Sequence, residues 1–234
     1  MEDELRIEGR NSVEEAIKRG IVQKLQIEKR VVPRYREIIR EAKEKGVPIQ
    51  EVPSLDVKQG IVAYIFPVQP WDIEEFIDKS FIVVADGVED PYNLGAIIRT
   101  AECAGVDGIV FPKHRSSLIS KGLISSSSGA IFHIPFSVVT NTAQSIDRFI
   151  QAGFSIVGAD PEGEAYFNID FGFPTVLVIG GEDKGLRPII KKRCNILAGI
   201  PMRGKLNSLN TSVAAGILIY EIAKKIFIQG GMKR

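Results

Sequence analysis

Short, uninterrupted apolar runs alternate with helical segments from residue 81 onward, and this alternation constrains the fold more than any other feature. The expected strands lie at 81–85, 108–111, 131–139, 154–159, 175–179 and 196–200. The expected helices lie at 94–104, 142–151, 187–193 and from about 213 to 228, with Asn141 or Thr142 capping the second. Strands without polar alternation are typical of a parallel sheet with both faces covered, so we expect an α/β fold.

The first 70 residues predict a separate, smaller α/β domain, which leaves 71–234 as the larger one. Asn11 or Ser12 is expected to cap a helix that ends at Gly20, and Pro33 to open a longer helix over 34–45. Strands are expected at 24–28, 47–52 and 61–68, with a helical turn at 54–58. The proline-rich segment PVQPW at 67–71 is a plausible linker.

Composition excludes several classes of protein. Two cysteines, Cys103 and Cys194, make a disulfide framework improbable and fit a reducing compartment, so we expect a cytoplasmic protein. With only two histidines and two cysteines we expect no metal site. The acidic start MEDELRIEGR is unlike a signal peptide, and no apolar run is long enough to span a bilayer.

Charge is nearly balanced overall, with 30 Lys+Arg against 29 Asp+Glu, but it is uneven along the chain. Residues 17–36 hold seven basic residues and one acidic residue, Glu28. Residues 108–146 hold no acidic residue, but they include Lys113, Arg115 and Lys121 among serines. Such groups hold phosphate backbones, so two patches favour an RNA or DNA partner over two solvated surfaces.

The two histidines offer little catalytic chemistry. His133 alternates with apolar residues in an expected strand and is interpreted as structural, whereas His114 lies in a basic loop suited to phosphate or solvent. The sequence has no GxGxxG, GxxxxGK[ST] or GxSxG motif, which disfavours dinucleotide, P-loop and serine-hydrolase chemistry. An α/β enzyme of this kind would work mainly by positioning its substrates.

Three expected strands end in loops of unusual composition, at 86–95, 180–185 and 200–212. Ligands of open parallel sheets bind at the carboxyl ends of the strands, so these loops predict a site. The last loop is rich in amides and hydroxyls and runs directly into a helix containing Ala214, Ala215 and Gly216. Two plainer interpretations stay open, because the polar residues could simply cap that helix and the glycines at 180–185 could simply form a turn.

With these loops in view, the chain resembles the SpoU family of the SPOUT superfamily of RNA 2′-O-ribose methyltransferases. The motifs that carry the resemblance are DGVEDPYNLGAIIRTAECAG at 86–105, LVIGGEDKGL at 177–186 and the segment 200–221. The N-terminal EGRNSVEEAI and KQGIVAYI resemble the L30e-like RNA-binding domain of many relatives. Lys58 and Gly181 depart from the residues common in the family, which are His, and Asn or Ala, respectively.

The resemblance implies a parallel-sheet SPOUT domain with a C-terminal trefoil knot, preceded by an L30e-like α/β domain. It implies S-adenosyl-L-methionine as cofactor, held by Gly180, Ile200 and Leu209. It also implies a homodimer that joins through the last helix and the first-motif region.

The resemblance further assigns roles in methyl transfer to a ribose hydroxyl. Arg99 would grip the target phosphate and stabilise the developing alkoxide, because a guanidinium is a poor base. Asn93 would orient the hydroxyl or Arg99, and Glu182 would pair with Arg99 or fix its loop. Ser208 and Asn210 would place the ribose.

The function expected from this resemblance is 2′-O-methylation of RNA, on a guanosine of 23S ribosomal RNA. The alternatives are a tRNA guanosine 2′-O-methyltransferase and a non-catalytic RNA-binding module with the same fold. No membrane partner is expected.

Overall fold

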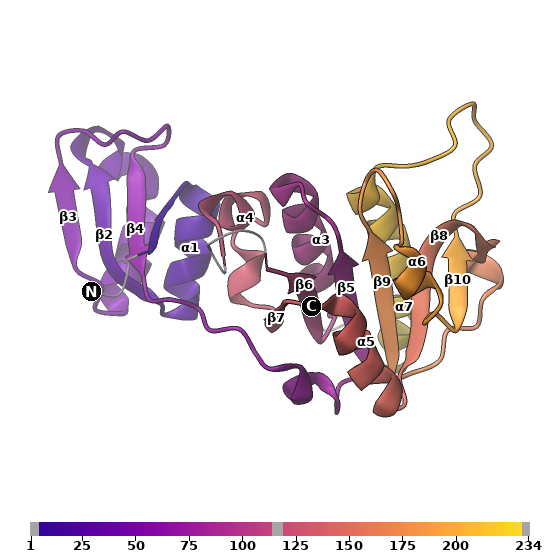
Figure 1. Ribbon diagram of the computed structural model, residues 1–234. Helices are drawn as coiled ribbons and strands as arrows, with labels where there is room; N and C mark the ends of the chain where they lie inside the picture. The colour runs from indigo at the N-terminus through magenta and orange to yellow at the C-terminus, as the bar shows by residue number, and fades with distance from the viewer. Residues whose placement is uncertain (1–4, 114–118, 231–234) are drawn as a thin grey trace.

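The computed structural model describes residues 5–113 and 119–230 and contains two sheets (Figure 1). The strands are β1 (Leu5–Glu8), β2 (Val22–Glu28), β3 (Ile49–Val52), β4 (Ile61–Ile65), β5 (Phe81–Asp86), β6 (Gly108–Pro112), β7 (Phe136–Val139), β8 (Ser155–Ala165), β9 (Thr175–Gly180) and β10 (Ile196–Gly199). The helices are α1 (Arg10–Arg19), α2 (Arg36–Glu44), α3 (Pro91–Cys103), α4 (Lys121–Ser126), α5 (Thr142–Gln151), α6 (Pro188–Lys191) and α7 (Thr211–Gly230). Within the described ranges no helix is long and apolar enough to cross a membrane.

The first sheet has the strand order β1-β4-β2-β3. Strands β1 and β2 run antiparallel to β4, while β2 and β3 are parallel. Residues 66–72 follow this sheet without regular structure, as the proline-rich sequence predicts. In Figure 1 they run along the lower edge of the molecule toward β5.

Several predictions for this N-terminal unit are wrong at the ends of its elements. Helix α1 begins two or three residues earlier than a cap at Asn11 or Ser12 predicts, with Gly9 at its N-cap and no side-chain cap bond. Ser12 is instead buried within the helix, with its Oγ 3.5 Å from the carbonyl oxygen of Ile124 in α4. Contact with the second unit therefore overrides local capping, although Gly20 ends the helix in the left-handed conformation as predicted.

Pro33 does not open the second helix. It lies inside a 3₁₀ segment, Lys29–Tyr35, and α2 starts after it. The helical turn expected at 54–58 is an irregular turn, and β1 was not predicted. Strand β1 pairs with β4 through Leu5–Glu8. This strand depends on its distant partner, because four residues of local sequence are too few to indicate a strand.

The second sheet has the order β10-β8-β9-β5-β6-β7, and every pairing in it is parallel. The predicted α/β fold with a covered parallel sheet is confirmed. In β5, Phe81, Val83 and Ala85 join the apolar cluster that includes residues of α3 and α7, while Ile82 and Val84 join the cluster that includes α5 and α6 residues. Both faces of the strand are thus buried, which explains its uninterrupted apolar run.

The segment before β7 differs most from the prediction. Only 136–139 of the expected strand 131–139 is extended, because Ala130–Phe132 forms a 3₁₀ turn. Lys121–Ser126, which overlaps the start of the serine run at 125–128, forms the unpredicted helix α4. The capping of α5 by Asn141 is confirmed, since its Oδ1 accepts hydrogen bonds from the backbone N–H groups of Ala143 and Gln144.

The C-terminal segment returns across the sheet after β10. Residues 201–210 are all exposed and form the long loop that projects at the upper right of Figure 1. Helix α7 then packs beside α3, with Ala215, Leu218, Ile219 and Ile222 buried. The trefoil knot in this segment stays a prediction.

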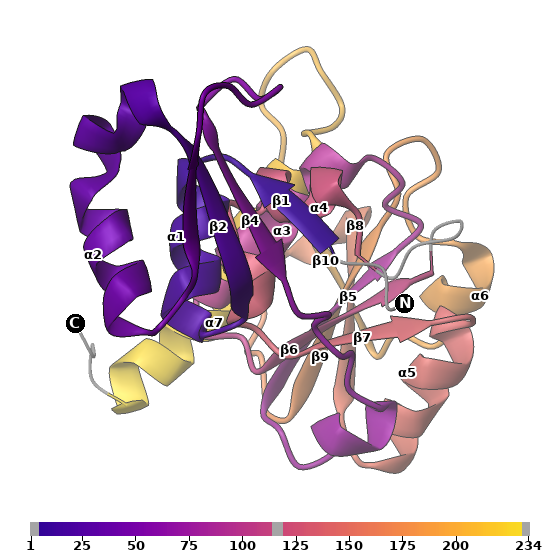
Figure 2. The same ribbon diagram turned by 90° about the vertical axis from the view of Figure 1, so that its left-hand side faces the viewer.

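The two units contact each other through α1. In Figure 1, α1 lies between the first sheet and α4, and in Figure 2 the first sheet lies in front of the second unit. Apolar residues of both units belong to one continuous cluster, and Glu15 Oε2 of α1 lies 2.7 Å from His133 Nε2. His133 is therefore an interface side chain outside any strand, which corrects its placement in a strand.

Candidate active site

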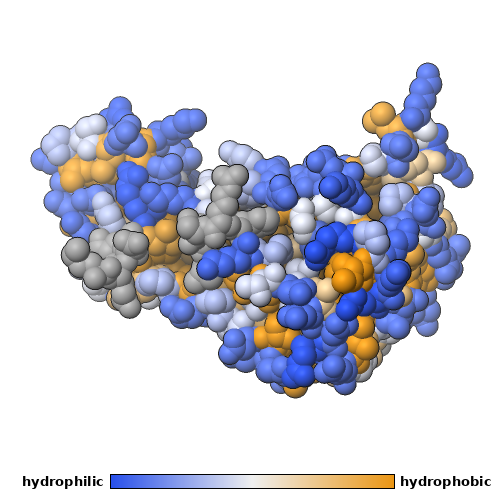
Figure 3. All heavy atoms as spheres, viewed as in Figure 1, coloured by the Kyte–Doolittle hydropathy of each residue, from blue (hydrophilic) through white to orange (hydrophobic). Residues whose placement is uncertain are grey.

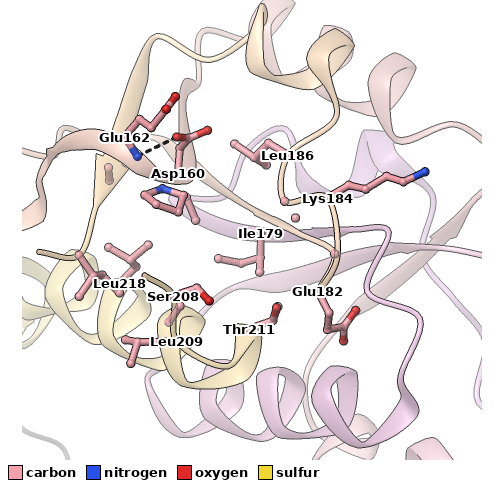
Figure 4. Close-up of a pocket in the computed structure, with 18 of the residues that line it drawn as sticks. Asp160, Glu162, Ile179, Glu182, Lys184, Leu186, Ser208, Leu209, Thr211 and Leu218 are labelled. Atoms are coloured by element: carbon pink, nitrogen blue, oxygen red, sulfur yellow. Dashed lines mark hydrogen bonds between the residues drawn. The ribbon is translucent and has the colours of Figure 1, made fainter. Parts of the chain in front are cut away.

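A cavity of about 670 Å³ opens beyond the carboxyl ends of β9 and β10, beside the start of α7 (Figure 4). Two of the three predicted loops form most of its wall. From the sequence predictions, Gly180, Glu182, Ile200, Ser208 and Leu209 line it. The site therefore lies at the edge of the sheet where parallel-sheet proteins bind ligands.

The cavity has an apolar wall and charged residues at both of its ends. Ile179, Ile200, Leu209 and Leu218 supply apolar wall. In Figure 4, Asp160 and Glu162 lie at the opposite end from Glu182, and the Lys184 side chain points away from the other labelled residues. The apolar part suits a flat aromatic group, while the charged end suits a polar, zwitterionic one.

Lys191 neutralises the acidic end. Its Nζ lies 2.8 Å from Asp160 Oδ2 and 3.5 Å from Glu162 Oε2. The hydrogen bond with Asp160 raises the pKa of the Lys191 ammonium. This end of the cavity thus presents both a paired cation and carboxylates to a ligand.

The glycine-rich loop after β9 folds back on itself. Gly181 and Gly185 form an isolated antiparallel bridge, and Gly185 has a φ of +59°. A Cβ at Gly180 would come within 2.2 Å of the carbonyl carbon of Gly185, and one at Gly181 within 2.3 Å of the carbonyl oxygen of Gly87. These two glycines are therefore required by the folding of the loop itself, which leaves its backbone on the cavity wall.

Asn93 connects the three predicted loops. Its Nδ2 donates to Glu182 Oε1 at 2.7 Å, and its Oδ1 accepts from Asn210 Nδ2 at 3.1 Å. Asn93 belongs to the first turns of α3, Glu182 to the glycine loop and Asn210 to the loop before α7. The Asn93 amide thus joins segments that are far apart in sequence, because Glu182 lies 89 positions and Asn210 lies 117 positions after it.

Asn210 also caps α7. Its Oδ1 accepts hydrogen bonds from the backbone N–H of Ser212 at 2.9 Å and of Val213 at 3.3 Å, and from Ser212 Oγ at 2.6 Å. Its oxygen therefore stabilises the helix start while its Nδ2 donates to Asn93. Asn210 thus both caps the helix and takes part in the contacts between the loops, so the two interpretations of this loop are compatible.

Arg99 does not line the cavity of its own chain. It lies six residues after Asn93 on α3, which places it about 120° around the helix. Its Nη1 donates to Ser128 Oγ at 3.2 Å, on the side of α4. The alternative in which Glu182 pairs with Arg99 is not realised among the described residues, because Glu182 bonds Asn93 and fixes its loop.

An ion pair that no local sequence pattern indicates supports the glycine-rich loop, and its carboxylate is buried while its guanidinium is half exposed. The Asp86 carboxylate at the end of β5 is 2% exposed and accepts from Arg187 Nε at 2.8 Å and Arg187 Nη2 at 2.6 Å. Thr142 Oγ1 also donates to Asp86. The pair spans 101 positions, so no local pattern could indicate it.

Asp160, in contrast, could have been predicted from the sequence. It follows the expected end of the 154–159 strand, and ligands of parallel sheets bind at the carboxyl ends of the strands.

The two basic patches are only partly free. Lys18 pairs with Glu14 and Glu15, and Arg30 pairs with Glu28. The side chains of Lys29, Arg34, Arg36, Lys113 and Lys121 are exposed or partly exposed. Arg115 and His114 lie outside the described residues.

Comparison with known proteins matches both units of this architecture. Residues 80–220 match the model of the SpoU rRNA Methylase family, and residues 6–71 match that of RNA 2′-O ribose methyltransferase substrate binding. An uncharacterized tRNA/rRNA methyltransferase of Archaeoglobus fulgidus is 38% identical over 94% of this chain and 99% of its own length.

Solved structures show the same arrangement. The SpoU methyltransferase AviRb from Streptomyces viridochromogenes, in complex with AdoMet, gives a TM-score of 0.80 at 25% identity over 96% of this chain and 91% of its own. The AdoMet-bound rRNA methyltransferase from Sinorhizobium meliloti gives 0.76 at 27% identity over 94% of this chain and 87% of its own. The family model covers more than half of the sequence and includes all three loops around the cavity, and the chain therefore belongs to the SpoU rRNA methylase family.

Proposed function

We propose that this protein is an S-adenosyl-L-methionine-dependent RNA methyltransferase that methylates a ribose 2′-hydroxyl, on a guanosine of 23S rRNA. The observation that carries the proposal is the Asn93 amide, which ties the three family loops together at the edge of the cavity. The names of the matched families and structures support the class of reaction.

The residues around the cavity fit the cofactor. Its volume of about 670 Å³ lies within the range usual for small-molecule sites. Ile200 and Leu209 would contact the adenine, the backbone at Gly180 would supply hydrogen-bonding groups, and the Asp160–Lys191 end suits the amino-acid part. S-adenosyl-L-methionine supplies an electrophilic methyl group on a sulfonium.

The chain's own polar groups would position the acceptor. Ser208 and Asn210 would hold the ribose, and Asn93, fixed by Glu182, would orient the hydroxyl. Arg99 would bind the target phosphate and stabilise the negative charge that develops on the ribose oxygen. Its guanidinium stays protonated, so positioning and electrostatics, rather than proton removal, would be its contribution.

We also propose a homodimer, and the position of Arg99 supports it. Because Arg99 is not on the wall of its own cavity, we infer that it serves the cavity of a second copy. Tyr92 on α3 and Val213 and Tyr220 on α7 are large apolar side chains that are about half exposed or more, and such a contact would cover them. Helices α3 and α7 lie side by side and would form one continuous interface.

The N-terminal unit would recognise the RNA, with residues 1–70 as the substrate-binding domain and 71–234 as the methyltransferase domain. Figure 3 shows the upper edge of the molecule hollowed between this unit and the projecting loop 201–210. The exposed Lys29, Arg34 and Arg36 belong to the N-terminal unit. The S. meliloti rRNA methyltransferase matches 94% of the chain, N-terminal unit included, which favours rRNA over tRNA.

Mapping 2′-O-methylation on total RNA from cells with and without the protein tests this proposal. We expect one ribose in 23S rRNA to lose its methyl group when the protein is absent. Loss of a tRNA methyl group instead would transfer the proposal to tRNA. Failure of calorimetry to detect S-adenosyl-L-methionine binding at millimolar concentration would favour a non-catalytic RNA-binding module.

A further inference from the structure

Ser128 has an unusual backbone conformation. Among residues 5–113 and 119–230 it is the one non-glycine residue with positive φ, at +53°. Glycine adopts this region freely, whereas an L side chain is disfavoured there.

The Ser128 hydroxyl holds Arg99. Arg99 Nη1 donates to Ser128 Oγ at 3.2 Å, and this is the hydrogen bond that the described part of the chain shows for its guanidinium. The Arg99 side chain is otherwise exposed. A long, exposed arginine loses much rotamer freedom when it binds a ligand, and a fixed contact reduces that loss.

The turn that carries Ser128 is rigidly attached to α3. The backbone N–H of Ser128 donates to the carbonyl of Ser125 at 3.0 Å, and Ser126 Oγ donates to the carbonyl of Pro91 at 2.7 Å. A Cβ at Gly95 would come within 2.0 Å of Ser126 Oγ, so the turn and the helix approach each other as closely as backbones allow. The distance from Ser128 to Arg99 is therefore set by the fold.

The same turn rests on the N-terminal unit. A Cβ at Gly129 would come within 2.8 Å of Glu15 Cβ and 3.4 Å of Ser12 Cα, both in α1. Glu15 is held in turn by His133 and Lys18, and these hydrogen bonds outweigh the effect of burial and lower its pKa. The unit that would bind RNA thus supports the turn that holds Arg99.

We propose that Ser128 is a positioning residue for Arg99, fixing the guanidinium in the orientation it needs to meet the target phosphate. The proposal rests on the role given to Arg99 under the proposed function. Glycine would relieve the strained φ at this position but would not supply the hydroxyl.

The test compares Ser128→Gly, Ser128→Ala and Ser128→Asn in the full chain. Ser128→Gly removes both the hydroxyl and the strain, so we expect an unchanged or higher Tm together with a kcat roughly tenfold lower, because a hydrogen bond to a charged group is lost. Ser128→Asn keeps an acceptor oxygen in a residue that tolerates positive φ, and we expect it to retain most of the activity. Cofactor affinity, measured by calorimetry, should not change in either variant.

A lower kcat with an unchanged or higher Tm indicates a positioning role for Ser128. If its role were structural, Tm and kcat would both fall. The matched control is Ser125→Ala, an exposed serine of the same run, which should behave as wild type. If Ser128→Ala does not fold, Ser128→Gly alone decides. A kcat for Ser128→Gly within about twofold of wild type overturns the proposal.

A double-mutant cycle separates this proposal from the proposed function. In an Arg99→Ala background, Ser128→Gly should lower the rate no further, because the two residues act through one contact. Additive effects would overturn the positioning role while leaving the methyltransferase reaction in place. A wild-type protein that methylates no RNA would overturn both.

Discussion

The guanidinium of Arg187 forms two hydrogen bonds with the buried carboxylate of Asp86, at 2.8 and 2.6 Å. Asp86 ends β5, and Arg187 follows directly on the glycine loop that lines the cavity. The hydrogen bonds to Asp86 raise the pKa of Arg187. This pair fixes one end of the loop, as Asn93 fixes its middle through Glu182.

Replacing Arg187 by alanine should strongly destabilise the protein. Among the described residues it leaves the buried Asp86 carboxylate with only Thr142 as a hydrogen-bond partner. Because the Arg187 side chain is half exposed, water can reach part of the space it leaves, and we expect a loss of about 1–3 kcal/mol in the free energy of unfolding. Urea unfolding measures this loss, provided that the m-value of the variant equals that of the wild type.

The Arg193–Asp147 pair is a matched control. Arg193 Nε and Nη2 each lie 2.8 Å from an Asp147 oxygen, but the Asp147 side chain is 41% exposed. Because water can solvate the carboxylate, Arg193→Ala should lower the free energy of unfolding much less than Arg187→Ala does. Equal losses in the two variants would contradict the importance given to burial at Asp86.

Two substitutions at Asn210 should separate helix capping from site geometry. Asn210→Asp keeps the oxygen that accepts from Ser212 and Val213, so thermal stability should hold, but it removes the donor to Asn93 and should lower kcat. Asn210→Ala removes both functions and should also lower the free energy of unfolding by about 1 kcal/mol. Equal activity in Asn210→Asp and wild type would show that the bond to Asn93 is dispensable.

Gly163→Ala should disturb the pairing of β8 with β10. A Cβ at Gly163 would lie 2.4 Å from the carbonyl oxygen of Leu197, beside the register shift between these strands. We expect a loss of about 1–3 kcal/mol in thermal or urea unfolding. At Gly172 a Cβ meets nothing within 4 Å, so Gly172→Ala should be neutral or slightly stabilising, and a comparable loss there would refute the steric argument.

Glu28 should make stability depend on acid pH. The side-chain hydrogen bond from Arg30, aided by the backbone N–H of Leu55, lowers the pKa of this buried carboxyl below its ordinary 4.5. The ionised form therefore stabilises the fold above about pH 4.5, and that contribution is lost as the pH falls through the lower, folded-state pKa.

Glu28→Gln should lower stability at neutral pH and flatten its decline in acid, as followed by urea midpoints between about pH 3 and 7. The exposed Glu51 on β3 offers a control, since Glu51→Gln should leave the pH profile as in wild type. An unchanged profile in Glu28→Gln would contradict the assignment.

The sequence predicted those features whose cause is local. The apolar run of β5 indicated burial on both faces, and Asn141 indicated the start of α5. The resemblance to one family brought Asn93, Glu182 and Asn210 into a single prediction, and the structure places them in contact. Their catalytic and cofactor roles, and those of Gly180, Ile200, Ser208 and Leu209, stay predictions.

The features that the sequence did not predict depend on partners that are distant in the chain. Ser12 fits a helix cap in sequence, but its helix packs against α4, and the serine is buried beside Ile124, 112 positions away. Arg187 pairs with Asp86 and Arg99 contacts Ser128 because helices and strands cross in space. No window of neighbouring residues contains that information. The helix expected at 187–193 is shorter in the structure, where α6 spans Pro188–Lys191 and Arg187 is its N-cap residue.

Residues 201–210 form an exposed loop between two anchored elements, β10 and α7. A protease that cuts there would leave each fragment held by its own buried contacts, Ala198 on one side and Ala215, Leu218 and Ile222 on the other. The nicked protein should therefore migrate as one particle under native conditions and as two peptides after denaturation. The rate of this cleavage then gives a direct readout of anything that closes the loop over the cavity.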